Sequence, residues 1–148
     1  MTVDYVTFSN LIIDDIVFPD GRKSMNVLGG AGTHALTGMR VWNGRLGYAA
    51  SVGKDLDPIH RQALQQFGSD VTGLIVREGY KTARAWQVFE ENDLRVETFR
   101  TDLDEFLRRI VQEEDLPSSY RQAKGFHLIW GSLAELGTLM RSLQRTNP

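Results

Sequence analysis

The stretch Val27–Leu36, with the sequence VLGGAGTHAL, decides the fold of this chain. It is typical of a strand that stops at a glycine cluster and turns directly into a helix. The three glycines allow a sharp bend and let a ligand approach the backbone closely. Beyond the cluster, Ala35, Leu36, Met39 and Trp42 recur at helical spacing and predict one apolar face. The start of such a helix offers unpaired N–H groups to a ligand. The alternative is a tight turn with nothing bound, because so short a motif is weak on its own.

The composition indicates one globular domain and gives no sign of a nucleic-acid or membrane partner. The chain has 148 residues, 41% of them hydrophobic and 24% charged, which is ordinary for a soluble domain. A net charge of -2 gives no basic field for nucleic acid or anionic membrane. The absence of cysteine excludes disulfides, thiolate zinc sites and a cysteine nucleophile. There is no apolar run of about 18 residues and no signal-peptide pattern. We therefore expect a cytoplasmic protein with neither a nucleic-acid nor a membrane partner.

The order of segments predicts an α/β fold. Residues Tyr5–Phe8 and Leu11–Ile13 are apolar and β-prone, and predict one buried first strand that ends near Asp14 and Asp15. These carboxylates belong either to a solvated turn or to a ligand-binding site at the end of the sheet, where ligands of α/β proteins usually bind. Strands alternate with helices from there on, which favours a mostly parallel sheet. Further strands are expected at 45–52, 71–76 and 125–131, and helices at 56–67, 102–114, 117–123 and from Ser132 onward.

Two segments break this alternation and predict hairpins. Residues 16–28 turn at Pro19–Arg22, where proline fixes φ and glycine tolerates a positive φ. Residues 82–89 and 94–99 flank a second turn at 90–93. Both arms of the second hairpin mix charged and apolar residues, as expected for a sheet with one wet face. We expect the two hairpins to form a small separate sheet that projects from the main one.

In the order of these parts, the chain resembles the N-terminal half of PfkB-type, ribokinase-like carbohydrate kinases. The resemblance is carried by Asn10–Asp14, Gly29–Ala35, Leu46–Gly47 with Ser51–Asp55, Phe67–Val71 and Thr82–Trp86. It implies a three-layer α/β/α body with a projecting small β-sheet lid that closes over the sugar. Residues 1–148 would form the N-terminal part of one ribokinase-like domain, with lid hairpins at about 16–28 and 82–100 and the C-terminal half missing.

The resemblance also implies a sugar-binding role for several residues. Asp14, or Asp15 in the adjacent register, would accept hydrogen bonds from sugar hydroxyls, since one carboxylate can accept from two neighbouring hydroxyls. Gly29 and Gly30 would bring backbone against the sugar ring. His34 stands where the family commonly has asparagine, and this departure leaves the identity of the substrate open. The alternative role of His34 is to cap its helix.

Other candidate residues are less distinctive. Arg84 and Trp86 alternate with alanines on a lid arm and are candidates to cover the ligand; the alternative is a solvated arginine and a packing tryptophan. His127 lies in a predicted buried strand and is expected to be a core residue. His60 and the acidic run 113–115 are expected on solvated helix surface. No metal ligands are predicted.

The resemblance places the family's catalytic base in a Gly-Ala-Gly-Asp motif of the second half, and this chain has no such motif. We therefore expect no catalytic residue here and no phosphoryl transfer by these residues alone. ATP and Mg²⁺ are implied for the full-length family, and we expect neither to be bound by this chain alone. Three hypotheses follow. The chain is part of a sugar or nucleoside kinase that phosphorylates a hydroxyl. Alternatively, it is a short, non-catalytic member that binds a ligand or forms a homodimer through its lid sheet, or it is an unrelated dinucleotide-binding enzyme. The third is weak, because the glycine spacing is not G-x-G-x-x-G.

Overall fold

A parallel sheet forms the body of the protein. The computed structural model describes residues 3–42, 44–129 and 132–146. The strands of the body sheet lie in the order β5-β4-β1-β9, with β6 beside the far end of β4, and every pair is parallel. Their bounds are β1 Tyr5–Phe8, β4 Leu46–Val52, β5 Ser69–Asp70, β6 Leu74–Val76 and β9 Gly125–Leu128. The parallel sheet expected from the alternation of segments is confirmed.

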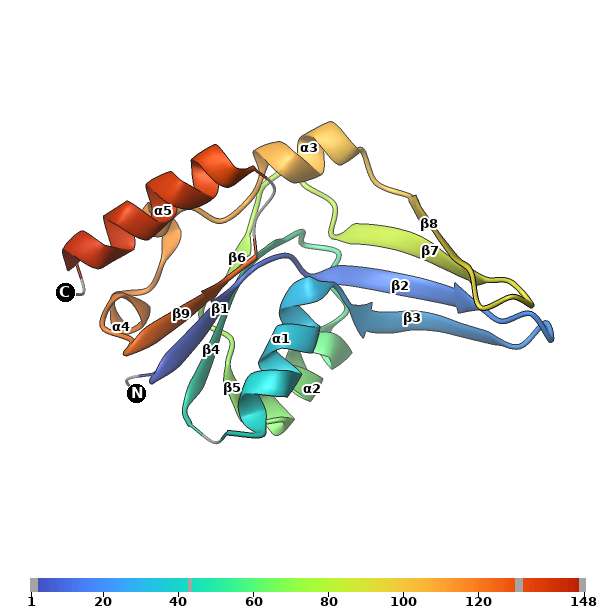
Figure 1. Cartoon of the computed structure of the whole chain (residues 1–148), viewed down its shortest axis with the longest axis horizontal. Helices are drawn as coiled ribbons and strands as arrows, with labels where there is room; N and C mark the ends of the chain where they lie inside the picture. Colours follow the sequence, from blue (N-terminus) through green and yellow to red (C-terminus); the bar gives the residue numbers. More distant parts are fainter. Residues whose placement is uncertain (1–2, 43, 130–131, 147–148) are drawn as a thin grey trace.

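Helices cover both faces of this sheet, as Figure 1 shows. Helices α1 (Ala31–Arg40) and α2 (Pro58–Gln66) lie on one side, and α4 (Ser118–Arg121) and α5 (Leu133–Thr146) lie on the other. Helix α3 (Leu103–Arg108) and the short 3-10 turn η1 (Glu113–Asp115) connect the lid to the second helical layer. The expected three-layer α/β/α body is therefore confirmed. Within the described ranges, no helix combines the length and the apolar character that a membrane crossing requires.

Each face of the body sheet has its own apolar core. Leu46, Tyr48 and Val52 on β4 pack with residues of α1 and α2, such as Leu36 and Leu64. The other face buries Phe8, Ala49, Tyr120 and Leu143 against α4 and α5. Strands buried on both faces need apolar residues in succession, which explains why the run at 46–52 contains almost no polar side chain.

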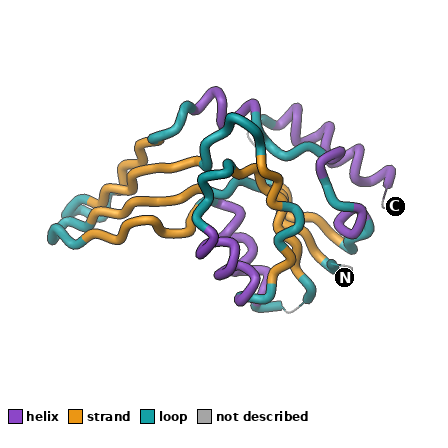
Figure 2. The backbone as a smooth tube through the Cα atoms, turned by 180° about the vertical axis from the view of Figure 1, so that it is seen from behind, coloured by secondary structure: helices purple, strands orange, loops and turns teal. Residues whose placement is uncertain are grey.

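A second sheet projects from the body as a lid (Figures 1 and 2). Its four strands are β2 (Ile12–Val17), β3 (Lys23–Gly29), β7 (Ala83–Phe89) and β8 (Arg95–Phe99), in the order β3-β2-β7-β8. The outer pairs are antiparallel, whereas the central pair β2–β7 is parallel and joins the two hairpins. The prediction of a separate, projecting sheet is confirmed.

The prediction of one long first strand was wrong. The chain breaks at 9–11, so that Tyr5–Phe8 belongs to the body and Ile12–Val17 to the lid. At the break, the Asn10 carbonyl accepts hydrogen bonds from the Gly32 N–H and the Tyr48 hydroxyl. These bonds replace the ladder bonds of a continuing strand. The first lid arm therefore begins at Ile12 instead of near residue 16, and Asp14 lies inside a lid strand.

Two predicted helix faces were also wrong. Trp42 lies beyond the end of α1 and is 87% exposed. On α2, His60 was expected on the solvated surface, but it is buried together with Leu64, while the apolar Ile59 is 59% exposed. His60 is not solvated, because its Nε2 lies 3.1 Å from Asn26 Oδ1 of the lid, to which it donates a hydrogen bond. Leu64 packs into the core of the body, whereas His60 is buried by a contact with a lid strand that the helical spacing of apolar residues does not reveal.

Other expectations fall on the second half of the chain. The expected helix at 102–114 is divided into α3 and η1. Within the acidic run, Asp115 is not solvated, since its Oδ1 accepts a hydrogen bond of 3.0 Å from Arg77 Nη1.

His127 is exposed because Phe126 and Leu128, its neighbours on the outer strand β9, take the positions facing the core. Ser132 does cap α5, through its Oγ and the Glu135 N–H. Trp130 and Gly131, at the end of the strand expected at 125–131, lie outside the described residues.

The Tyr120 hydroxyl ties the second helical layer to the body sheet. It accepts hydrogen bonds from the N–H groups of Tyr48 and Gly73 at 3.2 and 3.3 Å, and it donates to the Asp70 carbonyl at 2.7 Å. Its ring packs so closely on β4 that a Cβ added at Gly47 would lie 2.7 Å from it. Burial raises the pKa of Tyr120, so the hydroxyl keeps its proton.

We predict that Tyr120→Phe lowers the free energy of unfolding by about 1–3 kcal/mol, because it leaves two buried N–H groups and a buried carbonyl without their partner. Urea denaturation followed by circular dichroism measures this change. Tyr5→Phe is the matched control, since Tyr5 is 41% exposed. Equal losses in the two variants would contradict the role of the Tyr120 hydroxyl.

Candidate functional site

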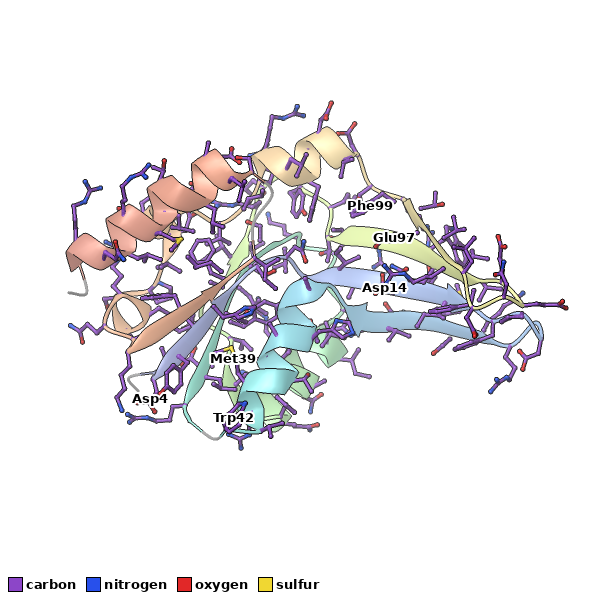
Figure 3. The ribbon with its side chains drawn as sticks, viewed as in Figure 1. Asp4, Asp14, Met39, Trp42, Glu97 and Phe99 are labelled. Carbon is purple, nitrogen blue, oxygen red and sulfur yellow. The ribbon has the colours of Figure 1, made fainter. Side chains whose placement is uncertain are left out.

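A polar pocket lies between the lid and the start of α1. We call it the lid pocket; it has a volume of about 320 Å³. Figure 3 shows Asp14, Glu97 and Phe99 of its wall on the lid strands, next to the first turn of α1. The pocket is lined by residues of the β1–β2 turn, of three lid strands and of the glycine turn: Asn10, Ile12, Asp14, Gly30, Ala31, His34, Gln87, Arg95, Glu97 and Phe99.

The glycine turn is required by its neighbours. Gly30 has a φ of +84°, and a Cβ there would lie 2.7 Å from the Ile12 nitrogen. A Cβ at Gly29 would lie 1.9 Å from Asp14 Oδ2. The space left by these two missing side chains is thus occupied by strand β2 and its carboxylate. Gly30 lines the lid pocket, whereas Gly29 supports Asp14 from behind.

Asn10 holds the turn between the two sheets against α1. Its Oδ1 accepts a hydrogen bond of 3.1 Å from the Ala31 N–H. Its carbonyl accepts from the Gly32 N–H at 3.2 Å and from the Tyr48 hydroxyl at 2.7 Å. Burial raises the pKa of Tyr48, which keeps the hydroxyl protonated and able to donate. Residues of β4, α1 and the β1–β2 turn are therefore fixed to one another at the edge of the lid pocket.

Gln87 joins two carboxylates inside the lid pocket. Its Nε2 donates to Asp14 Oδ1 at 3.1 Å and to Glu97 Oε1 at 2.8 Å. Gln87 is only 6% exposed, and its buried Oε1 has no hydrogen-bond partner among the described residues. Asp14 and Glu97 also keep lone pairs beyond those that Gln87 uses. The pocket therefore presents several acceptors and favours a ligand rich in hydroxyl donors.

Burial disfavours the negative charge of Asp14. Burial raises the pKa of the Asp14 carboxyl above its usual value, and the negative charge of Glu97 acts in the same direction. The hydrogen bond from Gln87 and the positive charges of His34 and Arg95 oppose the shift without cancelling it. A ligand that donates hydrogen bonds would replace part of the water that this carboxylate has lost.

His34 lies at the pocket with one ring nitrogen already engaged. Its Nδ1 donates to the Gly30 carbonyl at 2.9 Å, because a carbonyl can only accept. This bond goes to a carbonyl and satisfies none of the free N–H groups at the start of α1. The prediction that His34 caps its helix is therefore wrong, and the N-cap residue Gly30 makes no side-chain cap either. Nε2 is left as the ring atom that a ligand can meet.

Arg84 and Trp86 lie on the other face of the lid from Asp14. Asp14 is paired with Ala85 in the parallel register, so the residues on either side of Ala85 point away. The Trp86 ring packs under Arg100, whose guanidinium carbon is 5.0 Å from the ring centroid, and Arg100 forms an ion pair with Asp15. The structure brings Asp14, Gly30 and His34 together and leaves this pair out of the lid pocket.

Sequence reasoning missed four polar residues of the pocket: Asn10, Gln87, Arg95 and Glu97. The alternation along Ala83–Phe89 separates two sets of side chains, one with Arg84 and Trp86 and one with Gln87. The sequence offers no means of choosing between them, because the choice depends on which residue pairs with Asp14. A glutamine within an apolar strand, two positions from a buried alanine, was the available signal.

In the part of the chain that the structure describes, no three side chains of histidine, cysteine, aspartate or glutamate converge on one point.

Comparison with known proteins defines the fold. No family model matches the chain. A fructokinase from Xylella fastidiosa matches with a TM-score of 0.73 and 18% identity, over 97% of this chain and 48% of that structure. A nucleoside kinase of the ribokinase family from Methanocaldococcus jannaschii matches with a TM-score of 0.63 and 14% identity, over 88% and 46%. The chain has the ribokinase-like fold. The resemblance to the N-terminal half of these kinases is thus confirmed by the structure.

Two curated relatives are similar in sequence. An uncharacterized protein of Schizosaccharomyces pombe is 31% identical over 135 residues, which are 86% of this chain and 35% of the relative. A cytidine kinase of Thermococcus kodakarensis is 25% identical over 126 residues, 85% of this chain and 43% of the relative. The chain thus spans less than half the length of either relative.

We predict that Asp14→Asn raises stability at neutral pH, by about 0.5–2 kcal/mol. The folded-state pKa of Asp14 lies above the value of 3.8 for a free carboxyl, so the ionised group destabilises the fold at every pH above that folded-state pKa. The penalty fades as the pH falls toward 3.8, and the gain from the substitution must fade with it.

Thermal melting of both forms between pH 4 and pH 8 measures this difference. Asp20→Asn is the matched control on the same sheet, because hydrogen bonds from Arg22 lower the pKa of Asp20 and its substitution should give no gain. A gain for Asp14→Asn that does not change with pH would contradict the assignment.

Proposed function

We propose that this chain supplies the acceptor-binding part of a carbohydrate or nucleoside kinase. In the complete kinase, the γ-phosphate of ATP would be transferred to a hydroxyl of a small sugar or nucleoside. The observation that supports this best is the lid pocket, where the Asp14 carboxylate faces the Gly30 turn and His34 under a projecting sheet. The names of the cytidine kinase and fructokinase relatives are consistent with it.

The chemistry of the pocket matches a polyhydroxy ligand. Asp14 and Glu97 are acceptors beyond the bonds that Gln87 makes to them, and each can accept a hydrogen bond from a ligand hydroxyl. Such bonds to charged groups are the strong ones in a site from which water is largely removed. The lid sheet covers one side of the ligand, so that water is kept from the hydroxyl that receives the phosphate.

The same carboxylate argues against a phosphate cradle. In a dinucleotide-binding turn, the glycines face an anion at the helix start. Here a Cβ at Gly29 would meet the Asp14 carboxylate, so a negative charge already lies against the turn. A phosphate in that place would be repelled, which is why we do not favour the dinucleotide hypothesis.

ATP and Mg²⁺ belong to the proposed reaction of the complete kinase. The Xylella fastidiosa fructokinase has also been solved with bound ATP. This chain lacks the Gly-Ala-Gly-Asp motif, and its described residues offer no metal cluster. We therefore assign to this chain only the binding, orientation and shielding of the acceptor.

We predict that the chain binds ribose, fructose or a ribonucleoside, and that Asp14→Asn weakens this binding by about 10- to 100-fold, since hydrogen bonds to a charged acceptor are lost. Isothermal titration calorimetry of the 148-residue chain with each ligand is the measurement. Glu91→Gln is the matched control, because it removes one lid carboxylate outside the pocket, at the β7–β8 turn. If both variants bind as the wild type does, or if no such ligand binds, the proposed function is wrong.

A second candidate function is a non-catalytic member that forms a homodimer through the lid. It is favoured by the outer lid strand β8, where Val96 is 42% exposed and Leu94 at its start is 54% exposed. Exposed apolar edge strands are templates for pairing with another chain.

We predict for this case that the wild-type chain sediments as a dimer and that Val96→Lys shifts it to a monomer, because a charge on an edge strand opposes pairing. Analytical ultracentrifugation over a concentration series measures the shift. Lys81→Ala, outside the lid strands, serves as control. A wild-type chain that remains monomeric throughout would exclude this second function.

A further inference from the structure

Two carboxylates meet in the lid pocket, and the group that joins them is neutral. Asp14 and Glu97 come from different lid strands, yet both accept a hydrogen bond from the same atom, Gln87 Nε2, at 3.1 and 2.8 Å. An amide nitrogen donates two hydrogens but carries no charge. Two negative charges are therefore held near each other without a cation between them.

The charge of the pocket wall stays negative. Asp14 and Glu97 are acidic, whereas Arg95 is the one arginine or lysine in the described lining, at the start of β8 beside the lid turn. Burial raises the pKa of the Asp14 carboxyl, and the negative charge of Glu97 acts in the same direction. A neutral ligand leaves this excess charge in place, and a singly charged cation would balance it.

Asp14 has an acceptor atom left for such a ligand. The residue is only 9% exposed, and its Oδ2 forms no hydrogen bond within the described residues. This oxygen is not enclosed, and Asp14 lines the pocket, so that a ligand can reach the carboxylate. A carboxylate that is nine-tenths buried and still has a free oxygen points to a bound partner.

A charged nitrogen fits between these carboxylates better than a hydroxyl does. Gln87 shows that one nitrogen can reach Asp14 and Glu97 at once. A sugar hydroxyl donates a single hydrogen and can bond only one of them, whereas an ammonium group donates three. Hydrogen bonds between charged groups are also roughly twice as strong as neutral ones.

We propose that the acceptor is a small polyhydroxy compound with a primary amino group, and that its ammonium bridges Asp14 and Glu97 on the pocket side of Gln87. His34 Nε2 would accept a further hydrogen bond from the ligand, because Nδ1 donates to Gly30 and leaves Nε2 as the acceptor of the neutral ring. This inference rests on the proposed function, and it narrows the substrate class from hydroxyl-bearing ligands in general to amino sugars.

The test compares amino sugars with their neutral parents. Calorimetry at pH 7 uses D-glucose with its 2-amino, 3-amino and 6-amino deoxy derivatives, and D-fructose with 1-amino-1-deoxy-D-fructose. At least one amine should bind the wild-type chain about 10-fold or more tightly than its parent. N-acetylation of that amine should abolish the gain, since it removes the charge and keeps an N–H group.

Two variants of exposed wall residues test the placement with opposite signs. Glu97→Gln removes one of the two bridged charges and should weaken the preferred amino sugar by about 10-fold. The parent should lose no more than about 3-fold, because a glutamine oxygen still accepts from a hydroxyl. Arg95→Gln removes the positive charge and should tighten the amino sugar relative to its parent by about 2- to 5-fold. Glu91→Gln, at the β7–β8 turn outside the pocket, is the matched control and should leave all affinities unchanged.

The outcomes separate this inference from the proposed function. If every amine binds as its parent does, and both depend on Asp14, the amine assignment is wrong and the acceptor site stands. If an amine binds more tightly but Glu97→Gln leaves its advantage intact, the bridge between the two carboxylates is wrong. If no sugar of this panel binds, and neither ribose nor a ribonucleoside does, the proposed function itself is wrong and this inference with it.

Discussion

The hydrogen bonds around Asn10 are the constraint on which the rest of the molecule depends. The carbonyl of this one residue receives the Tyr48 hydroxyl from the body and the Gly32 N–H from α1, while its side chain receives the Ala31 N–H. They end β1, send the chain into the lid and fix the helix start beside β2. The lid pocket forms beside this junction, and Asn10 is part of its lining.

The lid pocket holds a buried carboxylate, and this burial has an electrostatic cost. Gly29 leaves room for a carboxylate that burial makes unfavourable, and Gln87 compensates by donating to that carboxylate and to Glu97 at once. A chain selected only for stability would have no reason to place two acids here. Polar groups that are buried and incompletely satisfied are typical of sites where a ligand completes the bonding.

Much of the fold could be predicted from local sequence, and the site only in part. Turn chemistry at Pro19–Arg22 and the glycine run near residue 30 indicated the hairpin, the bend and the helix, because both effects are local. The pairing of β2 with β7 joins residues about seventy positions apart, as the bond from Gln87 to Asp14 shows. Its register decides which side of β7 meets the ligand. The exposure of His127 and the burial of His60 also depend on such distant contacts.

The parallel pairing of β2 with β7 has a mechanical consequence. Two independent ribbons could each bend at their own base, but hydrogen bonds along Ile12–Val17 make the four strands one plate. Any displacement of the first hairpin is shared at once by the second, so Asp14, Gln87 and Glu97 keep their mutual spacing while the plate tilts. A tilt of this plate would therefore move all three lid residues together relative to His34 on α1.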